Sequence, residues 1–155
     1  MSIGVTTRDR VLPVILLQML VANATPKYLW VGIGCQRGIS KLAIESAIES
    51  VCAEYDLDLA TIAGIATLDL KANEPGLIDF CRESDWFLKT YSPERLNSVT
   101  VARSSQLVST LVGTASVAEA AALCAARSNI LLVPKQKFRL SSTSGFVTVA
   151  IAQSG

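Results

Sequence analysis

A short glycine-rich segment is the first stretch of the sequence whose residue types suit ligand binding. Gly32, Gly34 and Gly38 surround Cys35 and Arg37, between a strand-like run and a helix-like run. Glycines let the backbone turn sharply and bring N–H groups against an anion, and a following helix start adds partial positive charge. Arg37 adds a planar cation suited to a carboxylate. The spacing G-x-G-x-x-x-G matches neither the dinucleotide fingerprint nor the phosphate loop, so the alternative is a tight turn that binds nothing.

Cys35 has two interpretations. A thiol near the start of a helix has a lowered pKa and can act as a nucleophile. The sequence contains no histidine that could serve as its base, and a small residue in a crowded turn explains Cys35 equally well. The absence of histidine also excludes Ser-His-Asp catalysis and histidine-ligated metal sites.

A second polar segment, residues 67–76, follows another strand-like run and opens a helix. In open α/β sheets, ligands bind at the carboxyl ends of the strands. Asp69 or Glu74 could act as a general base on water, and Lys71 could hold an anionic group. The alternative is structural: Asn73 or Glu74 caps the following helix and Lys71 is solvated.

Two later segments carry further candidates. Ser116 and Glu119 have the spacing of a capping box, in which the two side chains satisfy N–H groups at a helix start. Lys135 follows a buried strand and could reach the same sheet edge as the second segment. The next two cations, Lys137 and Arg139, are interpreted as solvent-facing charges that protect an edge strand.

The hydrophobic pattern predicts the elements that must position these residues. Strands are expected at Tyr28–Ile33, Thr61–Leu68, Trp86–Tyr91, Val99–Ala102 and Ile130–Val133, the last stopped by Pro134. Helices are expected from about Asp9 to Ala22, from Ser40 to Tyr55, from Pro75 to Ser84, after Ser92-Pro93, from Ser105 to Val112, and from Ser116 to Arg127. Residues 138–151 read as an antiparallel hairpin at a sheet edge. The fold class is α/β, a three-layer α/β/α sandwich with a mixed, mostly parallel sheet of about five strands and a C-terminal hairpin.

Length and composition indicate one globular domain over residues 1–155, in which residues 1–25 form an appended helix or the remnant of a linker. The chain is 50% hydrophobic and 17% charged, with a formal net charge of +1. That balance provides no overall field for nucleic acid or an anionic membrane. The apolar run 11–22 is shorter than the about 20 residues of a spanning helix.

The cysteines give no sign of a metal or redox site. The four of them form no C-x-x-C pair, so no protein metal site is expected, and nothing at the amino terminus resembles a secretory signal. Cys52 and Cys124 lie in apolar, helix-like stretches where free, buried cysteines are ordinary. A cytoplasmic location is therefore expected.

The same segments carry a resemblance to one family, the carboxy-terminal domain of the cobalamin-biosynthesis protein CbiG and its stand-alone relative CobE. The motifs that resemble this family are Gly32-Ile33-Gly34-Cys35-Gln36-Arg37-Gly38, then Thr67 with Asp69-Leu70-Lys71 and Glu74-Pro75-Gly76, then Gly113 to Ala121, and finally Val133-Pro134-Lys135. They extend over about residues 27–152. Gln36 stands where the family commonly has an arginine, and Arg37 follows it.

The resemblance implies a role in building the corrin ring. Proteins similar to full-length CbiG are cobalt-precorrin-5A hydrolases, which open the ring-A lactone with loss of acetaldehyde. The implied catalytic residues are Asp69 and Glu74. The implied substrate-binding residues are Gly34, Cys35, Arg37, Gly38, Thr67, Lys71, Ser116, Glu119 and Lys135. No cofactor is implied, because any cobalt would arrive with the substrate.

One departure from the family keeps three functions open. The CbiG-like enzyme has an additional amino-terminal domain, and nothing in this sequence corresponds to it. The chain is therefore a hydrolase or the C-terminal part of one, a non-catalytic CobE-like module that binds or carries a corrinoid intermediate, or an interaction domain. The expected partners are a corrinoid intermediate, a separate N-terminal CbiG-type domain or other pathway enzymes, and a second copy in a homodimer.

Overall fold

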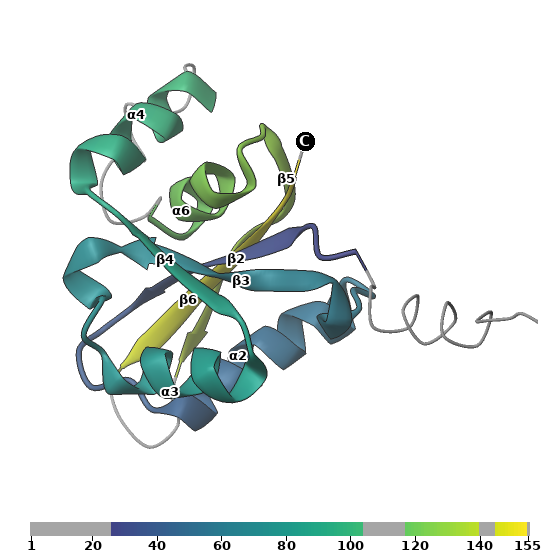
Figure 1. Cartoon of the computed structure of the whole chain (residues 1–155), viewed down its shortest axis with the longest axis vertical. Helices are drawn as coiled ribbons and strands as arrows, with labels where there is room; N and C mark the ends of the chain where they lie inside the picture. Colours follow the sequence, from purple (N-terminus) through teal and green to yellow (C-terminus); the bar gives the residue numbers. More distant parts are fainter. Residues whose placement is uncertain (1–25, 104–116, 140–144, 155) are drawn as a thin grey trace, which may run out of the picture.

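A five-stranded mixed sheet forms the centre of the protein, as a computed structural model shows for residues 26–103, 117–139 and 145–154 (Figure 1). The strand order is β4-β3-β2-β6-β5. The pairs β2–β3 and β3–β4 are parallel, whereas β6 runs antiparallel to both β2 and β5. The strands are β2 (Leu29–Cys35), β3 (Ile62–Leu68), β4 (Phe87–Tyr91), β5 (Ile130–Arg139) and β6 (Phe146–Gln153).

Helices cover both faces of this sheet, which confirms the predicted sandwich (Figure 1). On one face lie α2 (Lys41–Glu54) and α3 (Pro75–Ser84), and on the other lie α4 (Pro93–Arg103) and α6 (Val117–Ala126). Two short 3-10 turns, η1 (Leu59–Thr61) and η2 (Asp69–Lys71), flank β3.

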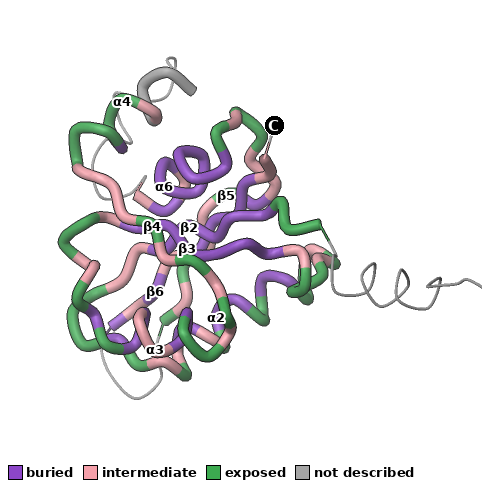
Figure 2. The backbone as a smooth tube through the Cα atoms, viewed as in Figure 1, coloured by how far each residue is buried: buried purple, intermediate pink, exposed green. Residues whose placement is uncertain are grey.

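Two apolar cores separate the layers, and Figure 2 shows the buried chain running through the sheet and the facing sides of its helices. Alternate residues of each strand supply the two cores, because successive side chains point to opposite faces. Val31 and Val149 belong to the core beneath α2 and α3, whereas Trp30 and Ala152 belong to the core beneath α6. The alanines of α6 allow this helix to approach the sheet closely. An alanine Cβ at Gly32 of β2 would lie 1.8 Å from the carbonyl oxygen of Ala118.

Local signals explain where several helices begin. The Ser40 hydroxyl accepts the Ala43 N–H at 3.1 Å and caps α2. Pro75 occupies the first turn of α3, where its missing N–H costs nothing. Ser92 caps α4 by accepting the Arg95 N–H at 3.2 Å, as the Ser-Pro sequence predicts.

Two predicted elements are wrong. Residues 99–102 are not a strand but continue α4, because the helix that starts at Pro93 runs on to Arg103. The strand at Ile130 does not stop at Pro134 but continues to Arg139. Proline is tolerated there because β5 is an edge strand, and the pairing with β6 shifts register between Val133 and Gln136. The helices predicted at 9–22 and 105–112 lie outside the described residues.

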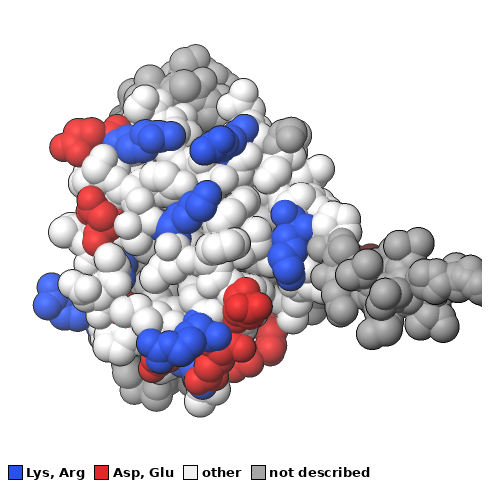
Figure 3. Space-filling view, viewed as in Figure 1, with Lys and Arg blue, Asp and Glu red and all other residues white. Residues whose placement is uncertain are grey.

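The surface in Figure 3 carries acidic and basic side chains together on the side of α2 and α3. Lys41 Nζ lies 2.6 Å from Glu83 Oε1, and Arg82 pairs with Asp79 at 3.2 Å within α3. Exposed pairs of this kind contribute at most about 1 kcal/mol each. Within the part of the chain that the structure describes, no helix is long and apolar enough to cross a membrane.

Candidate functional site

A cavity of about 480 Å³ lies at the carboxyl ends of β2 and β3, beside the start of β6. Its size falls within the range of small-molecule sites, and its place is where ligands bind in open α/β sheets. The lining residues come from the glycine turn, from β3 and η2, and from the starts of α6 and β6: Gly34, Cys35, Gln36, Arg37, Thr67, Leu68, Leu70, Lys71, Glu74, Val117, Phe146 and Thr148.

The glycine turn between β2 and α2 forms one wall of the cavity. Gly38 has a φ of +83°, a conformation that L side chains rarely adopt. Its N–H donates a 2.9 Å hydrogen bond to Glu74 Oε1. The two segments that the sequence singles out are therefore joined directly, and the turn is held by a side chain that itself lines the cavity.

Glu74 is the buried carboxylate of the site. Its residue is only 8% exposed, which is rare for a glutamate, and it occupies the N-cap position of α3 without making a side-chain capping bond. The helix-capping alternative for this side chain is therefore wrong. No described residue other than Gly38 forms a hydrogen bond with the carboxylate, so one of its oxygens can face the cavity.

Thr67 fixes the floor between the two parallel strands. It is fully buried, and its hydroxyl donates a 2.7 Å hydrogen bond to the carbonyl oxygen of Ile33 in β2. This bond ties the end of β3 to the strand that leads into the glycine turn. Thr67 thus positions the site, and because its hydroxyl proton is donated to Ile33, it is not available to a ligand.

Two cations face the same cavity from different strands. Arg37 lies in the exposed glycine turn after β2, and Lys71 ends η2 after β3. Parallel neighbouring strands end at the same sheet edge, so residues far apart in sequence meet there. Together with Glu74, these side chains place two positive charges and one buried negative charge around the cavity.

Cys35 lines the cavity as an un-ionised thiol. Burial raises its pKa to about 11, an effect that the charge of Lys71 opposes and that of Glu74 reinforces. The thiol is therefore protonated near neutral pH, which disfavours its interpretation as a nucleophile. All four cysteines are free, and Cys52, Cys81 and Cys124 are buried.

The strand β6 supplies lining residues that the sequence did not indicate. Phe146 is the first residue of β6 and Thr148 is the third, and both line the cavity. The Gln36 side chain accepts the Phe146 N–H at 3.3 Å and so joins the glycine turn to β6. The alternation of apolar residues predicted this strand, but not that it inserts between β2 and β5, so that β5 is the edge strand on this side of the sheet.

Four other predicted site residues, Gly38, Asp69, Glu119 and Lys135, do not line the cavity. Asp69 is exposed in η2 and does not line the cavity, although its sequence neighbours Leu68 and Leu70 do. Glu119 lies in the first turn of α6, where its Oε2 accepts the backbone N–H of Lys135 at 3.0 Å. This bond joins α6 to β5, so both residues serve a connection that the sequence did not suggest. Ser116 lies outside the described residues.

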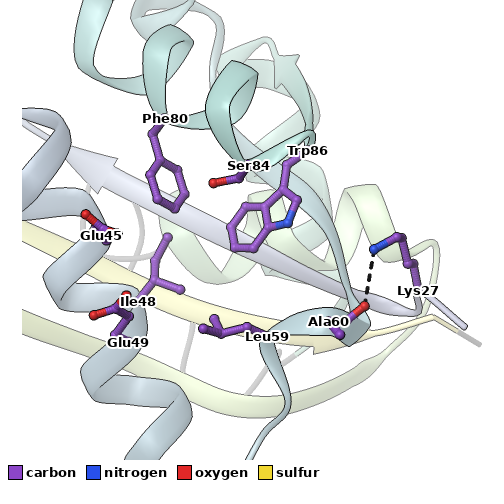
Figure 4. A pocket seen from close by; sticks show the side chains of 9 residues that line it. All are labelled: Lys27, Glu45, Ile48, Glu49, Leu59, Ala60, Phe80, Ser84 and Trp86. Carbon is purple, nitrogen blue, oxygen red and sulfur yellow. Dashed lines mark hydrogen bonds between the residues drawn. The ribbon is translucent and has the colours of Figure 1, made fainter. Parts of the chain in front are cut away.

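A second cavity, of about 330 Å³, lies between α2 and α3 (Figure 4). Phe80 and Trp86 meet edge to face on one side, with ring centroids 5.2 Å apart, and Glu45 and Glu49 approach from α2. Lys27 closes the other end, where its Nζ donates to the carbonyl oxygen of Ala60. None of the residues predicted to do chemistry lines this second cavity. Among the described residues, no three Cys, Asp or Glu side chains gather as metal ligands.

Comparison with known proteins agrees with the resemblance found in the sequence. Residues 29–152 match the model of a family described as the cobalamin synthesis G C-terminus. A protein of Priestia megaterium named cobalt-precorrin-5A hydrolase is 34% identical over 127 residues, which cover 82% of this chain and 32% of that protein. The chain thus spans about a third of the length of this relative.

Solved structures share the fold. The crystal structure of CobE, a protein from the cobalamin biosynthetic pathway, superposes with a TM-score of 0.66 at 28% identity, covering 84% of this chain and 96% of that one. The cobalamin biosynthesis protein chiG of Agrobacterium tumefaciens gives a TM-score of 0.60 at 29% identity, with 82% and 98% covered. A cobalamin biosynthesis protein G homologue of Sulfolobus solfataricus, at 21% identity and a TM-score of 0.57, shows the same fold over 83% of this chain and 38% of that one.

Proposed function

Because the chain belongs to the family of cobalamin synthesis G C-terminal domains, we propose that its large cavity binds a corrinoid biosynthetic intermediate and hydrolyses the ring-A lactone of cobalt-precorrin-5A. The observation that carries the proposal is the meeting of Arg37, Lys71 and Glu74 at one cavity. Corrinoid intermediates carry acetate and propionate groups around the ring, and guanidinium and ammonium groups bind such carboxylates. In this proposal, one edge of the macrocycle binds in the cavity.

Glu74 is the general base that we assign to this reaction. Its carboxylate is held by Gly38 through one oxygen, so the other can accept a proton from an attacking water. Burial beside the cavity keeps the carboxylate away from bulk water. Asp69 is exposed and lines no part of the cavity, which favours Glu74 of the two carboxylates.

The reaction then needs donors for the developing oxyanion. Water adds to the lactone carbonyl as Glu74 takes its proton, and we assign the oxyanion donors to the N–H groups of the glycine turn other than that of Gly38. Collapse of this intermediate breaks the ester C–O bond, leaving a carboxylate and an alcohol. Loss of the alcohol proton and cleavage of the neighbouring C–C bond release acetaldehyde, and the electron pair of that bond passes to the conjugated macrocycle. Cobalt, where present, enters with the substrate.

A binding module without catalysis is the second candidate. The observation in its favour is that the chain matches 96% of CobE, whereas it spans 32% of the protein named as a hydrolase. A separate N-terminal domain would then complete the enzyme on the exposed side of the cavity. A homodimer and a cytoplasmic location remain predictions from the sequence.

The deciding experiment incubates the purified 155-residue chain with cobalt-precorrin-5A and follows both the corrinoid absorbance and free acetaldehyde. A spectral shift with aldehyde release is expected for the wild type, and a shift alone for Glu74→Gln. A spectral shift without aldehyde from the wild type would leave the binding module as the function. No spectral change at all would overturn both candidates.

A further inference from the structure

A row of three residues crosses the sheet at the cavity. Gly34 of β2 lies opposite Thr148 of β6, and Thr148 lies opposite Lys137 of β5. Residues directly opposite in antiparallel pairs point to the same face. Because adjacent strands lie about 4.8 Å apart, the Cα of Lys137 is about 10 Å from that of Gly34.

The row lies on the face of the sheet that α6 covers. Val147 and Val149 point into the core beneath α2 and α3, so Thr148 between them points to the other face. On that face, the first turn of α6 lies directly over Gly32, and α6 begins at Val117, which lines the cavity. Gly34 therefore lies just beyond the part of the sheet that α6 covers. Because Gly34 has no side chain, the cavity extends down to the backbone of β2 at this position.

Lys137 is exposed at the β5 end of this row and lies beside the cavity without lining it. Its Nζ lies 4.2 Å from the ring centroid of Phe146, and both Phe146 and Thr148 line the cavity. A cation–π contact holds the ammonium group beside a lining residue and leaves its positive charge in place. Among the described residues, no carboxylate forms an ion pair with Lys137, whereas Lys41 and Arg82 are both paired.

We propose that Lys137 is a further substrate-binding residue of this cavity, which recognises an ionised carboxylate on the periphery of the corrinoid. The inference rests on the proposed function and deepens it. Lys71 follows β3, Arg37 follows β2 and Lys137 lies on β5, so the three cations are spread along one sheet edge. Several ionised carboxylates along one edge of the macrocycle can each form an ion pair with one of these cations, whereas the neutral amides of an amidated corrinoid cannot.

The experiment compares two corrinoid probes that differ in charge. Cobyrinic acid carries ionised side chains, and cobinamide carries amides in their place. Titration of the full chain, followed by absorbance, measures the Kd for each probe. Lys137→Met is expected to weaken cobyrinic acid binding about tenfold, as the loss of one charge-assisted contact implies, and to leave cobinamide binding unchanged. Lys137→Arg should restore most of the affinity.

Lys89 provides the matched control. It lies on the opposite edge strand, β4, and its Nζ lies 4.6 Å from the ring centroid of Trp30. Neither lysine lines the cavity itself, but Phe146 beneath Lys137 does, whereas Trp30 beneath Lys89 does not. Lys89→Met should leave both Kd values unchanged. Equal cobyrinic acid binding by wild type and Lys137→Met would overturn this inference alone, as would an equal loss for both probes. Failure of the wild type to bind either probe would overturn the proposed function and this inference with it.

Discussion

Glu74 Oε1 accepts the backbone N–H of Gly38 at 2.9 Å, across 36 positions of the sequence. The bond joins the start of α3 to the glycine turn after β2, and Glu74 itself lines the cavity, as do Gly34, Cys35 and Arg37 beside Gly38. A base and the backbone donors of an oxyanion site must keep a fixed separation, because a small displacement costs much of the rate. This single bond therefore couples the two groups that the proposed hydrolysis requires.

Glu74→Gln is expected to separate these two roles. The amide oxygen of glutamine can still accept the Gly38 N–H, so the fold and the corrinoid Kd should change little. The amide cannot take a proton from water, so kcat for acetaldehyde release should fall about 10²–10⁴-fold. Glu74→Ala is the control that also loses the bond to Gly38. Full activity in Glu74→Gln would assign the base to another group.

Gly32→Ala is expected to destabilise the protein strongly. Its Cβ would lie 1.8 Å from the carbonyl oxygen of Ala118, and a backbone atom of a packed helix cannot move aside without shifting α6. Such overpacking costs about 3 kcal/mol. The matched control is Gly34→Ala in the same strand, whose Cβ would meet only Thr148 Cβ at 3.8 Å. Urea unfolding of both variants tests this, and similar midpoints would contradict the close approach of α6.

The buried hydroxyl of Thr67 gives a third prediction. Thr67→Val keeps the shape of the side chain but removes the 2.7 Å hydrogen bond to Ile33, which should lower the free energy of unfolding by about 1–2 kcal/mol. Thr90 lies directly opposite Thr67 in β4 and is only partly buried, so Thr90→Val is the matched control. Thermal unfolding with both variants provides the measurement. An equal effect in the two would show that the Ile33 bond contributes nothing specific.

Local signals in the sequence were sufficient for much of the fold. The Ser40 cap, Pro75 and the Ser92-Pro93 pair each act within a few residues, so α2, α3 and the start of α4 could be predicted from short segments. Pro134 shows the limit of such signals. Proline forbids a central strand but not an edge strand, and nothing local reveals that β5 lies at the edge.

The residues of the candidate site also fall into two groups, those that could be predicted from the sequence and those that could not. Arg37, Lys71 and Glu74 could be expected together, because parallel strands end at one sheet edge and all three follow such strands. Phe146 and Thr148 could not, because their place depends on β6 pairing with β2 at a distance of more than a hundred residues. Lys137 is exposed on the edge strand β5, as its interpretation as a solvent-facing edge charge predicts, and only its contact with Phe146 connects it to the cavity.

The chemistry of Cys35 gives the last prediction, a pH dependence. Burial raises its pKa from 9.0 to about 11, so the folded protein favours the neutral thiol. The stability that this preference provides is complete below pH 9 and is lost as the pH rises towards 11. Alkylation of the native protein by iodoacetamide should accordingly accelerate about tenfold per pH unit from pH 8 to pH 10, since only the thiolate reacts.

Cys35→Ser should abolish this fastest phase, because the other three cysteines are buried, and it should leave acetaldehyde release intact. A rate that levels off near pH 8, or loss of activity in Cys35→Ser, would restore the thiol as a candidate nucleophile.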